Sequence, residues 1–299
     1  MIAVTASRAE AGAWTRERGE GLLILGVSIH ELLPAKGYEA LDRLKGEVSA
    51  YAEYGFNDRL TLVGRAAWQS MHATELMSEE IRYTVQLEPP PDPLRDDPDE
   101  DFDGDGVPNR LDPPPAPDPI FVERTRTEFF LPEPETGVGG LEAGIRYRFI
   151  ERSRFVLSAQ ALAGIPGTGE NRNNHRFGEG GGAVDLRLQA GRSFGRSAFA
   201  NISVGSRFLP GDRPDELRLD LTAGTHIARG VRVMAQSYSV WSTGEGVSGL
   251  HGYSGHRAQL SLLWPIDSAR RAQIAALTTF HRDNMSRETA LIASVWRTF

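Results

Sequence analysis

The second half of the chain repeats one kind of segment up to its last residue. Within residues 217–224, Leu217, Leu219, Leu221 and Ala223 share one face, and the residues between them share the other. A period of two places successive side chains on opposite faces of a β-strand. A strand with one apolar face fits a soluble sandwich with that face inward, or a membrane-spanning barrel with that face outward.

The same alternation predicts roughly twelve strands, an even number as in bacterial outer-membrane barrels. Short turns alternate with longer connections along the chain, apart from the short connection at Asp283, and this is the asymmetry expected between the two sides of an outer membrane. We therefore predict an all-β antiparallel transmembrane β-barrel, with a soluble all-β sandwich or barrel as the competing fold. The expected strands cover residues 22–32, 45–54, 60–68, 141–149, 155–163, 184–190, 198–208, 217–225, 231–241, 258–264, 272–280 and 290–299.

The composition agrees with this fold and excludes several classes of protein. No run of about twenty apolar residues is present, so no transmembrane helix is expected. The mean hydropathy of -0.35 suits a barrel, because only every second residue of its strands must be apolar. The chain has no Cys, which removes disulfide scaffolds and thiol catalysis, and its net charge of -7 argues against nucleic acid as a partner.

Three regions are expected along the 299 residues. Residues 1–13 contain small residues, Ala9-Glu10-Ala11 and Ala11-Gly12-Ala13, that resemble the cleavage end of a secretory signal; we expect a signal-peptide remnant or a flexible N-terminus. Residues 14–299 form the barrel, and residues 72–137 form a long Pro/Asp-rich loop within it. Inside that loop, residues 81–87 and 120–130 look extended, and they predict a projecting hairpin or a further pair of barrel strands, giving about fourteen.

The loop also carries a calcium-binding motif. Carboxylates stand at positions one, three and five, glycine at six, a carbonyl donor at seven, Asn at nine and a carboxylate at twelve, which is the spacing that wraps one Ca²⁺ in oxygen ligands. The expected ligands are Asp101, Asp103, Asp105, Val107, Asn109 and Asp112. The pattern resembles thrombospondin type-3 repeats, and no helical pattern flanks it, so we expect a stiffened loop rather than a calcium sensor. The alternative is an acidic, solvated linker.

If the apolar faces meet lipid, charged side chains line the lumen, and arginines outnumber carboxylates among them. Such a lumen predicts either passage of small polar or anionic solutes or an Arg–carboxylate network that fills a narrow barrel. The expected lumen-lining residues are Glu47, Glu53, Arg65, Glu142, Arg146, Arg148, Asp185, Arg187, Arg207, Arg218, Asp220, Arg232 and Arg257.

Aromatic residues near the expected strand ends predict the aromatic girdles of a membrane barrel, although ordinary strand packing favours the same residues. They are Tyr54, Trp68, Phe208, Trp241, Trp264 and Trp296.

The chain ends in Phe299 after an alternating strand, which resembles the signal read by the barrel-assembly machinery of the outer membrane. Leu291, Ala293, Val295 and Phe299 share the face expected to meet outer-membrane lipid, and Arg297 interrupts that face. The partners expected from the sequence are this machinery, membrane lipid, and a small solute or polysaccharide.

Three segments together resemble the outer-membrane channel family named for the MetA pathway of phenol degradation. They are residues 14–21 (WTRERGEG), 53–60 (EYGFNDRL) and 139–147 (GGLEAGIRY). These motifs describe strands and turns, so the resemblance implies the barrel and its location more than a substrate.

The sequence therefore predicts a passive channel or transport component for small solutes. The alternative is a non-conducting surface barrel whose calcium-stiffened loop binds or organises extracellular polysaccharide. We expect no enzyme, since Ser254 and the loop histidines His226, His251, His256 and His281 lie in no recognisable nucleophile motif.

Overall fold

The structure is a computed structural model of the whole chain. It describes residues 12–33, 43–74, 77–87, 120–130, 135–165, 182–195, 197–211, 214–228, 230–244 and 252–299. The signal-like residues 1–11 and the calcium motif at 101–112 lie outside these ranges.

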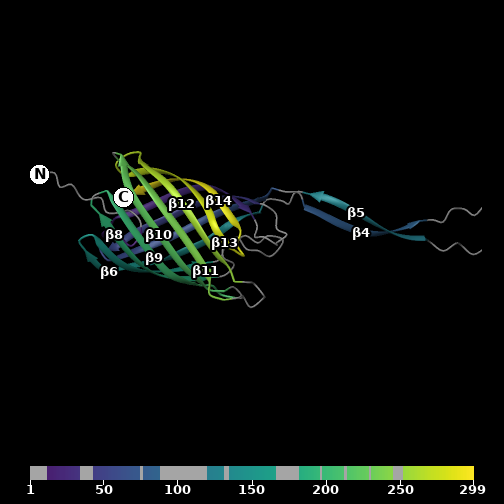
Figure 1. Ribbon diagram of the computed structural model, residues 1–299, viewed down its shortest axis with the longest axis horizontal. Helices are drawn as coiled ribbons and strands as arrows, with labels where there is room; N and C mark the ends of the chain where they lie inside the picture. Colours follow the sequence, from purple (N-terminus) through teal and green to yellow (C-terminus); the bar gives the residue numbers. More distant parts are fainter. Residues whose placement is uncertain are drawn as a thin grey trace, which may run out of the picture. The chain divides into compact units, whose positions relative to one another are not determined.

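Twelve of the fourteen strands that the described residues form make a closed antiparallel barrel. Each barrel strand pairs with its neighbour in sequence, apart from β3 with β6 across the insertion and β1 with β14 at the closure (Figure 1). The barrel strands are β1 (Gly21–Leu33), β2 (Arg43–Asn57), β3 (Leu60–Ala73), β6 (Glu135–Arg152), β7 (Phe155–Ile165), β8 (Ala183–Phe194), β9 (Ala198–Phe208), β10 (Glu216–Ala228), β11 (Val231–Ser242), β12 (Ser254–Pro265), β13 (Arg270–Asp283) and β14 (Arg287–Thr298).

The two-residue period decides which side chains face outward. On β1, Leu25, Val27 and Ile29 are more than half exposed, while His30, one step further along the strand, is buried. Exposed apolar side chains alternate with buried polar ones on the other strands as well, so the wall is apolar outside and polar inside. This arrangement inverts a soluble barrel and matches a barrel surrounded by lipid.

Most short and long connections lie at opposite ends of the barrel; the three-residue connection from β13 to β14 is the exception, because it lies at the end opposite to the other short turns. Turns of two to four residues follow β2, β6, β8, β10 and β12, and we call this the short-turn end. The ends of the chain that belong to the barrel, β1 at Gly21 and β14 at Thr298, also lie there, because Leu22 is paired with Thr298. The longer connections, including the insertion after β3, leave from the opposite, long-connection end.

The prediction of about twelve barrel strands is confirmed, and each of the twelve expected segments lies in one of these strands. Strands β4 (Met77–Leu87) and β5 (Ile120–Phe130) do not join the barrel; they pair only with each other, from Met77 with Phe130 to Leu87 with Ile120. They belong to a second compact unit, residues 76–131. Strand β3 continues to Ala73 and β6 starts at Glu135, so barrel strands run a little into the expected loop. The described residues contain no helix long and apolar enough to cross a membrane.

Most of the expected girdle aromatics lie on the outer face. Tyr54, Trp68, Phe208 and Trp241 are each at least a third exposed, and Trp264 is half-buried. The prediction was wrong for Trp296, which is only 7% exposed and points into the barrel. Its indole N–H donates to Gln273 Oε1 at 2.9 Å and lies 3.1 Å from Ser294 Oγ. The reason is parity, since Trp296 falls on the inner face of β14 while Val295 and Arg297 fall on the outer one.

Candidate functional site: the barrel lumen

The chain's own N-terminal segment, residues 12–20, crosses the barrel interior at the short-turn end. Its backbone amides donate hydrogen bonds to side chains on two different parts of the barrel wall. Ala13 N–H donates to Asn201 Oδ1 on β9 and Arg16 N–H donates to Thr61 Oγ1 on β3, each at 2.9 Å. At the end of the segment, Gly19 and Glu20 exchange backbone hydrogen bonds with Gly55 at 2.9 Å. The contacts reach strands on different sides of the barrel, so the segment crosses the lumen rather than following one wall.

Trp14 anchors this segment in an apolar cluster. Its ring meets Phe199 edge-on, with centroids 6.2 Å apart, and lies over Gly191. A Cβ at Gly191 would stand 2.6 Å from the Trp14 ring, so only glycine leaves room there. The buried members of the cluster come from five strands of the wall, and they are Leu22, Phe199, Met234, Leu263 and Trp296. Apolar inner residues on β1 explain why its alternation is less regular in the sequence.

A buried ion network fixes the same segment to the wall. The Glu53 carboxylate accepts from Arg146 Nη1 at 2.9 Å, from Arg16 Nε at 2.7 Å and from Tyr51 Oη at 2.6 Å. Arg146 also donates to the Trp14 carbonyl at 3.2 Å and to Gln160 Oε1 from two of its nitrogens. The side chains of Glu53 and Arg146 are 3% and 4% exposed. Charges buried this deeply are tolerated because each has several partners.

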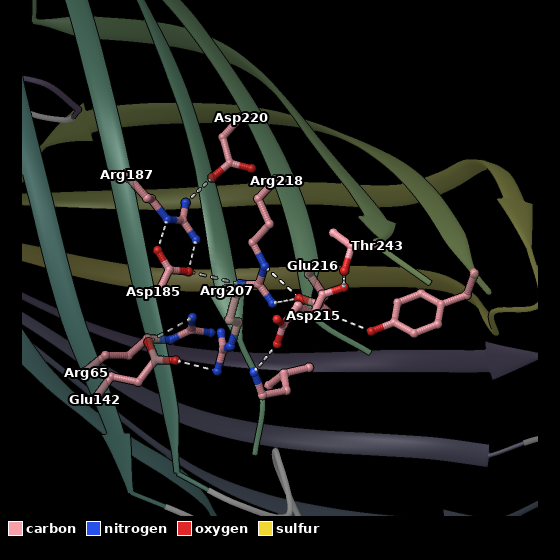
Figure 2. Close-up of polar contacts among 12 residues, drawn as sticks. Arg65, Glu142, Asp185, Arg187, Arg207, Asp215, Glu216, Arg218, Asp220 and Thr243 are labelled. Atoms are coloured by element: carbon pink, nitrogen blue, oxygen red, sulfur yellow. Dashed lines mark hydrogen bonds and ion pairs between the residues drawn. The ribbon is translucent and has the colours of Figure 1, made fainter. Parts of the chain in front are cut away.

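Toward the long-connection end, the wall formed by β3, β6, β8, β9 and β10 carries a lattice of arginines and carboxylates (Figure 2). Arg187 forms a bidentate pair with Asp185 and bridges to Asp220 on β10. Arg218 pairs with Glu216 on its own strand and lies 3.5 Å from Asp185. Its partner Glu216 accepts a further hydrogen bond from the Tyr253 hydroxyl at 2.6 Å.

The remaining part of this lattice centres on Glu142. Arg207 Nη2 donates to Glu142 Oε1 at 3.0 Å, across two intervening strands, and Arg65 Nη1 lies 3.9 Å from Glu142 Oε2. Contacts between strands that are not neighbours are possible only on the concave inner face, so these side chains lie in the lumen. Arg65 stays 57% exposed there, and it faces the open part of the lumen.

The opposite wall, on β1, β2, β12 and β14, carries a second cluster around Glu288. This carboxylate accepts from Arg257 Nη1 at 2.6 Å, lies 3.6 Å from Lys45 Nζ, and contacts His30 Nδ1 at 2.6 Å. Lys45 is also 3.5 Å from Glu47, which accepts from the Gln69 amide at 2.8 Å.

His30 contacts Ser28 Oγ through its other nitrogen, Nε2, at 2.7 Å. Ser28, His30 and Glu288 therefore stand in the order of a nucleophile, a base and an orienting acid. Acyl transfer also needs donors aimed at the developing oxyanion. Strand β1 is paired on both edges, with β14 and β2, so the barrel ladder occupies the amides next to Ser28. The backbone amides beside Ser28 are therefore not free to bind an oxyanion, and the Lys45 and Arg257 side chains are directed at Glu288.

All thirteen expected lumen-lining residues are on barrel strands at inner-face positions. Glu53 and Arg146 lie at the closed short-turn end; Arg65, Glu142, Asp185, Arg187, Arg207, Arg218 and Asp220 form the lattice; Glu47 and Arg257 lie on the opposite wall. Arg148 pairs instead with Glu151 near a short turn, and Arg232 stacks over the Phe199 ring at 5.6 Å.

Sequence reasoning missed the residues that close the short-turn end, above all Trp14 and Arg16. One signal was available, because Leu22 and Ile24 are apolar on the face that should be polar, and such residues need an apolar partner inside the barrel. It also missed Ser28, His30, Lys45 and Glu288, which parity alone places on the inner face.

The described residues hold no group of three or more His, Cys, Asp or Glu side chains arranged for a metal ion.

No protein-family model matches this sequence, and no curated protein matches it. The fold, however, is similar to that of the COG4313 outer membrane channel from Pseudomonas putida F1, with a TM-score of 0.61 over 98% of this chain and 100% of that one at 12% identity. Two further structures are more distant. The CymD monoaromatic hydrocarbon channel has a TM-score of 0.47 at 10% identity over 95% of this chain and 89% of that one. The KdgM porin has a TM-score of 0.46 at 8% identity over 92% of this chain and 99% of that one. The fold is thus that of outer-membrane channel barrels of the type the sequence resembles.

Proposed function

We propose that the protein is a passive outer-membrane channel for small polar or anionic solutes, narrowed at its short-turn end by residues 12–20. The observation that carries the proposal is a closed barrel with an apolar outside and a charged inside, in which one arginine, Arg65, remains 57% exposed to the lumen. A barrel that served only as a rigid scaffold would have no need of an open, charged interior.

The charge of the lumen supports the preference for anions. The thirteen expected residues comprise eight arginines and five carboxylates, and Lys45, Glu216 and Glu288 on the same inner face bring the totals to nine cations and seven carboxylates. Fixed charges that line a narrow aqueous path raise the local concentration of ions of opposite sign. The segment at the short-turn end is held to the wall by hydrogen bonds, the Arg16–Glu53 ion pair and packing, so it can be displaced without breaking a covalent bond.

Conductance in planar bilayers tests this function. The full chain should give small channel events, and a variant lacking the residues up to Arg18 should give events several-fold larger, because the segment no longer crosses the lumen at the short-turn end. Slower migration on gels after boiling serves as the control for a folded barrel. Folded protein that shows no channel events in either form would contradict the proposal.

We also propose calcium binding by the insertion, as a second function compatible with the first. The ligand spacing from Asp101 to Asp112 supports it, and so does the pairing of Leu87 with Ile120, which brings the two ends of residues 88–119 together. An isolated two-stranded ribbon is marginally stable in water, so an ion bound beyond its end would stabilise β4 and β5. A stiffened surface loop of this kind suits attachment of extracellular polysaccharide.

Calorimetric titration of the intact protein with Ca²⁺ tests this second function. The parent should bind one ion in the range of extracellular modules, about 10⁻⁴ to 10⁻³ M. A variant carrying Asp103→Ala and Asp105→Ala should lose that binding, and equal uptake by both proteins would refute it.

A further inference from the structure

A hollow of about 180 Å³ opens into the lumen beside Arg65 and Arg207. The rest of its lining consists of Glu142, Gln69 and small or apolar residues from β3, β6, β7 and β8. The hollow lies toward the long-connection end, away from the segment that crosses the lumen at the short-turn end.

The hollow exists because two neighbouring strands carry almost no side chain at this level. Glu142 on β6 is paired with Gly164 on β7, and Gly164 is paired with Ala183 on β8. Arg207, from β9, reaches over both small residues to Glu142. Packing does not force glycine here, because a Cβ at Gly164 would meet its nearest atoms at an ordinary 3.6 Å. A larger residue would fit, and its absence keeps the space open.

The edge of this hollow carries an open positive group. Arg65 and Arg207 both contact the same carboxylate, Glu142, at 3.9 and 3.0 Å, so that carboxylate is shared between two guanidiniums. The 57% exposure of the Arg65 side chain leaves much of its guanidinium open to solvent in the lumen. A guanidinium presents paired N–H groups in a plane, which match a carboxylate in two parallel hydrogen bonds.

We propose that this hollow is a binding site for the carboxylate of a small organic acid, whose body lies against Ala67, Gly164 and Ala183. The site rests on the proposed channel function in one respect, since a solute entering from the long-connection end would meet it on its way through the lumen. The volume of about 180 Å³ and the small residues of the lining favour a short acid over a sugar.

Equilibrium binding to the intact protein in lipid nanodiscs tests the site without requiring transport. Labelled benzoate is the probe, and benzamide, which has the same shape and no charge, is the matched ligand; empty nanodiscs correct for partition into lipid. Benzoate should bind at one saturable site, and benzamide should bind at least about tenfold more weakly, as expected for loss of a charge-assisted hydrogen bond.

Three substitutions should change benzoate affinity in different directions. Arg65→Gln should weaken it about tenfold, and Gly164→Leu should abolish it by filling the hollow with the charges intact. Glu142→Gln should instead tighten it, because the ligand no longer competes with a resident carboxylate. Arg257→Gln removes a lumen arginine on the opposite wall, 35% exposed, and should leave benzoate binding unchanged.

Equal binding of benzoate and benzamide would overturn the proposal, as would parental affinity in both Arg65→Gln and Gly164→Leu. Gel migration before and after boiling confirms that each variant has folded. The binding site and the channel function can be tested separately. Saturable benzoate binding without conductance would support the site and contradict the channel function. Conductance without saturable binding would support the channel function and contradict the site.

Discussion

The two ends of the lumen use the same residue types for opposite results. At the short-turn end, Arg146 and Glu53 form an ion pair whose side chains are 4% and 3% exposed. At the long-connection end, Arg65 and Glu142 face each other at 57% and 16% exposure. Both pairs stand on inner-face positions of alternating strands. What separates them is the N-terminal segment, which covers the first pair, whereas Arg65 of the second pair stays open to the lumen, so accessibility rather than composition decides where a solute can meet charge.

Removing the carboxylate at each end should give the largest contrast. Glu53→Ala leaves two guanidiniums, Arg146 and Arg16, without the Glu53 carboxylate, and Arg146 is almost fully buried. The substitution should therefore lower the free energy of unfolding by about 3–5 kcal/mol. Glu142→Ala removes the shared carboxylate from Arg65, which is exposed, and from Arg207, which is 8% exposed, so it should cost less, about 1–2 kcal/mol. Urea unfolding in detergent, followed by gel migration, measures both. Equal losses in the two variants would show that the ends do not differ in burial as described.

Loosening the N-terminal segment should affect only the short-turn end. Trp14→Ala removes the ring that packs against Phe199 and Gly191, so residues 12–20 should detach while the barrel stays closed. Limited trypsin digestion should then cut after Arg16 and Arg18 several-fold faster than in the parent. Trp241→Ala, a substitution on the outer wall, is the matched control and should leave the cutting rate as it is.

Neutralising the exposed end should alter ion selectivity. Arg65→Gln removes an open positive charge and should reduce the preference for anions, seen as a smaller reversal potential in a salt gradient. The difference should shrink in about 1 M salt, where the Debye length is roughly 3 Å. A shift that persists unchanged at high salt would mean that Arg65 acts through pore shape.

A charge outside the lumen should matter least. In the turn before β13, the Asp267 carboxylate accepts hydrogen bonds from the Arg270 side chain and from the Ala269 and Arg270 amides, which hold its pKa below the ordinary value. Because the folded-state pKa is depressed, this contribution to stability is present above the unfolded pKa and is lost as pH falls through the folded one. Asp267→Ala should therefore lower the unfolding midpoint slightly at neutral pH and not at all in strong acid.

No activity is expected from the Ser28–His30–Glu288 network. A fluorophosphonate probe, which captures activated serines, should label the folded protein no more than a Ser28→Ala variant. Labelling that disappears in this variant would show that a group other than the backbone amides of β1 binds the oxyanion.

Much of the barrel was predictable because its rule is local. Parity along Leu217–Ala223 fixes which side chains face out, and the same count from Ala290 forward places Phe299 on the outer face. The register of each hairpin follows the same local rule. Trp296 shows the limit: being aromatic near a strand end suggested the girdle, although parity placed it inside. The calcium motif and the domain boundaries stay predictions, since residues 101–112 lie outside the described ranges.

The closed end was not predictable in the same way. Residues 12–20 have no alternation, and their place in the lumen depends on partners as distant in sequence as Asn201. The sharing of Glu142 by Arg65 and Arg207 was equally hidden, because it needs the curvature that brings β3, β6 and β9 around one hollow. Side chains that meet across a barrel are set by closure, which no short stretch of sequence encodes.

Closure itself has a consequence for how the protein is made. Gly21 and Phe299 exchange backbone hydrogen bonds at 2.7 and 3.1 Å, so the seam joins the first barrel residue to the last residue of the chain. The seam between β1 and β14 can therefore form only after both strands have been synthesised. Residues 12–20 run directly into the strand that forms this seam, and they enter the lumen most easily while the seam is still open. The final step of assembly, closure of the seam, would then trap the segment inside the lumen.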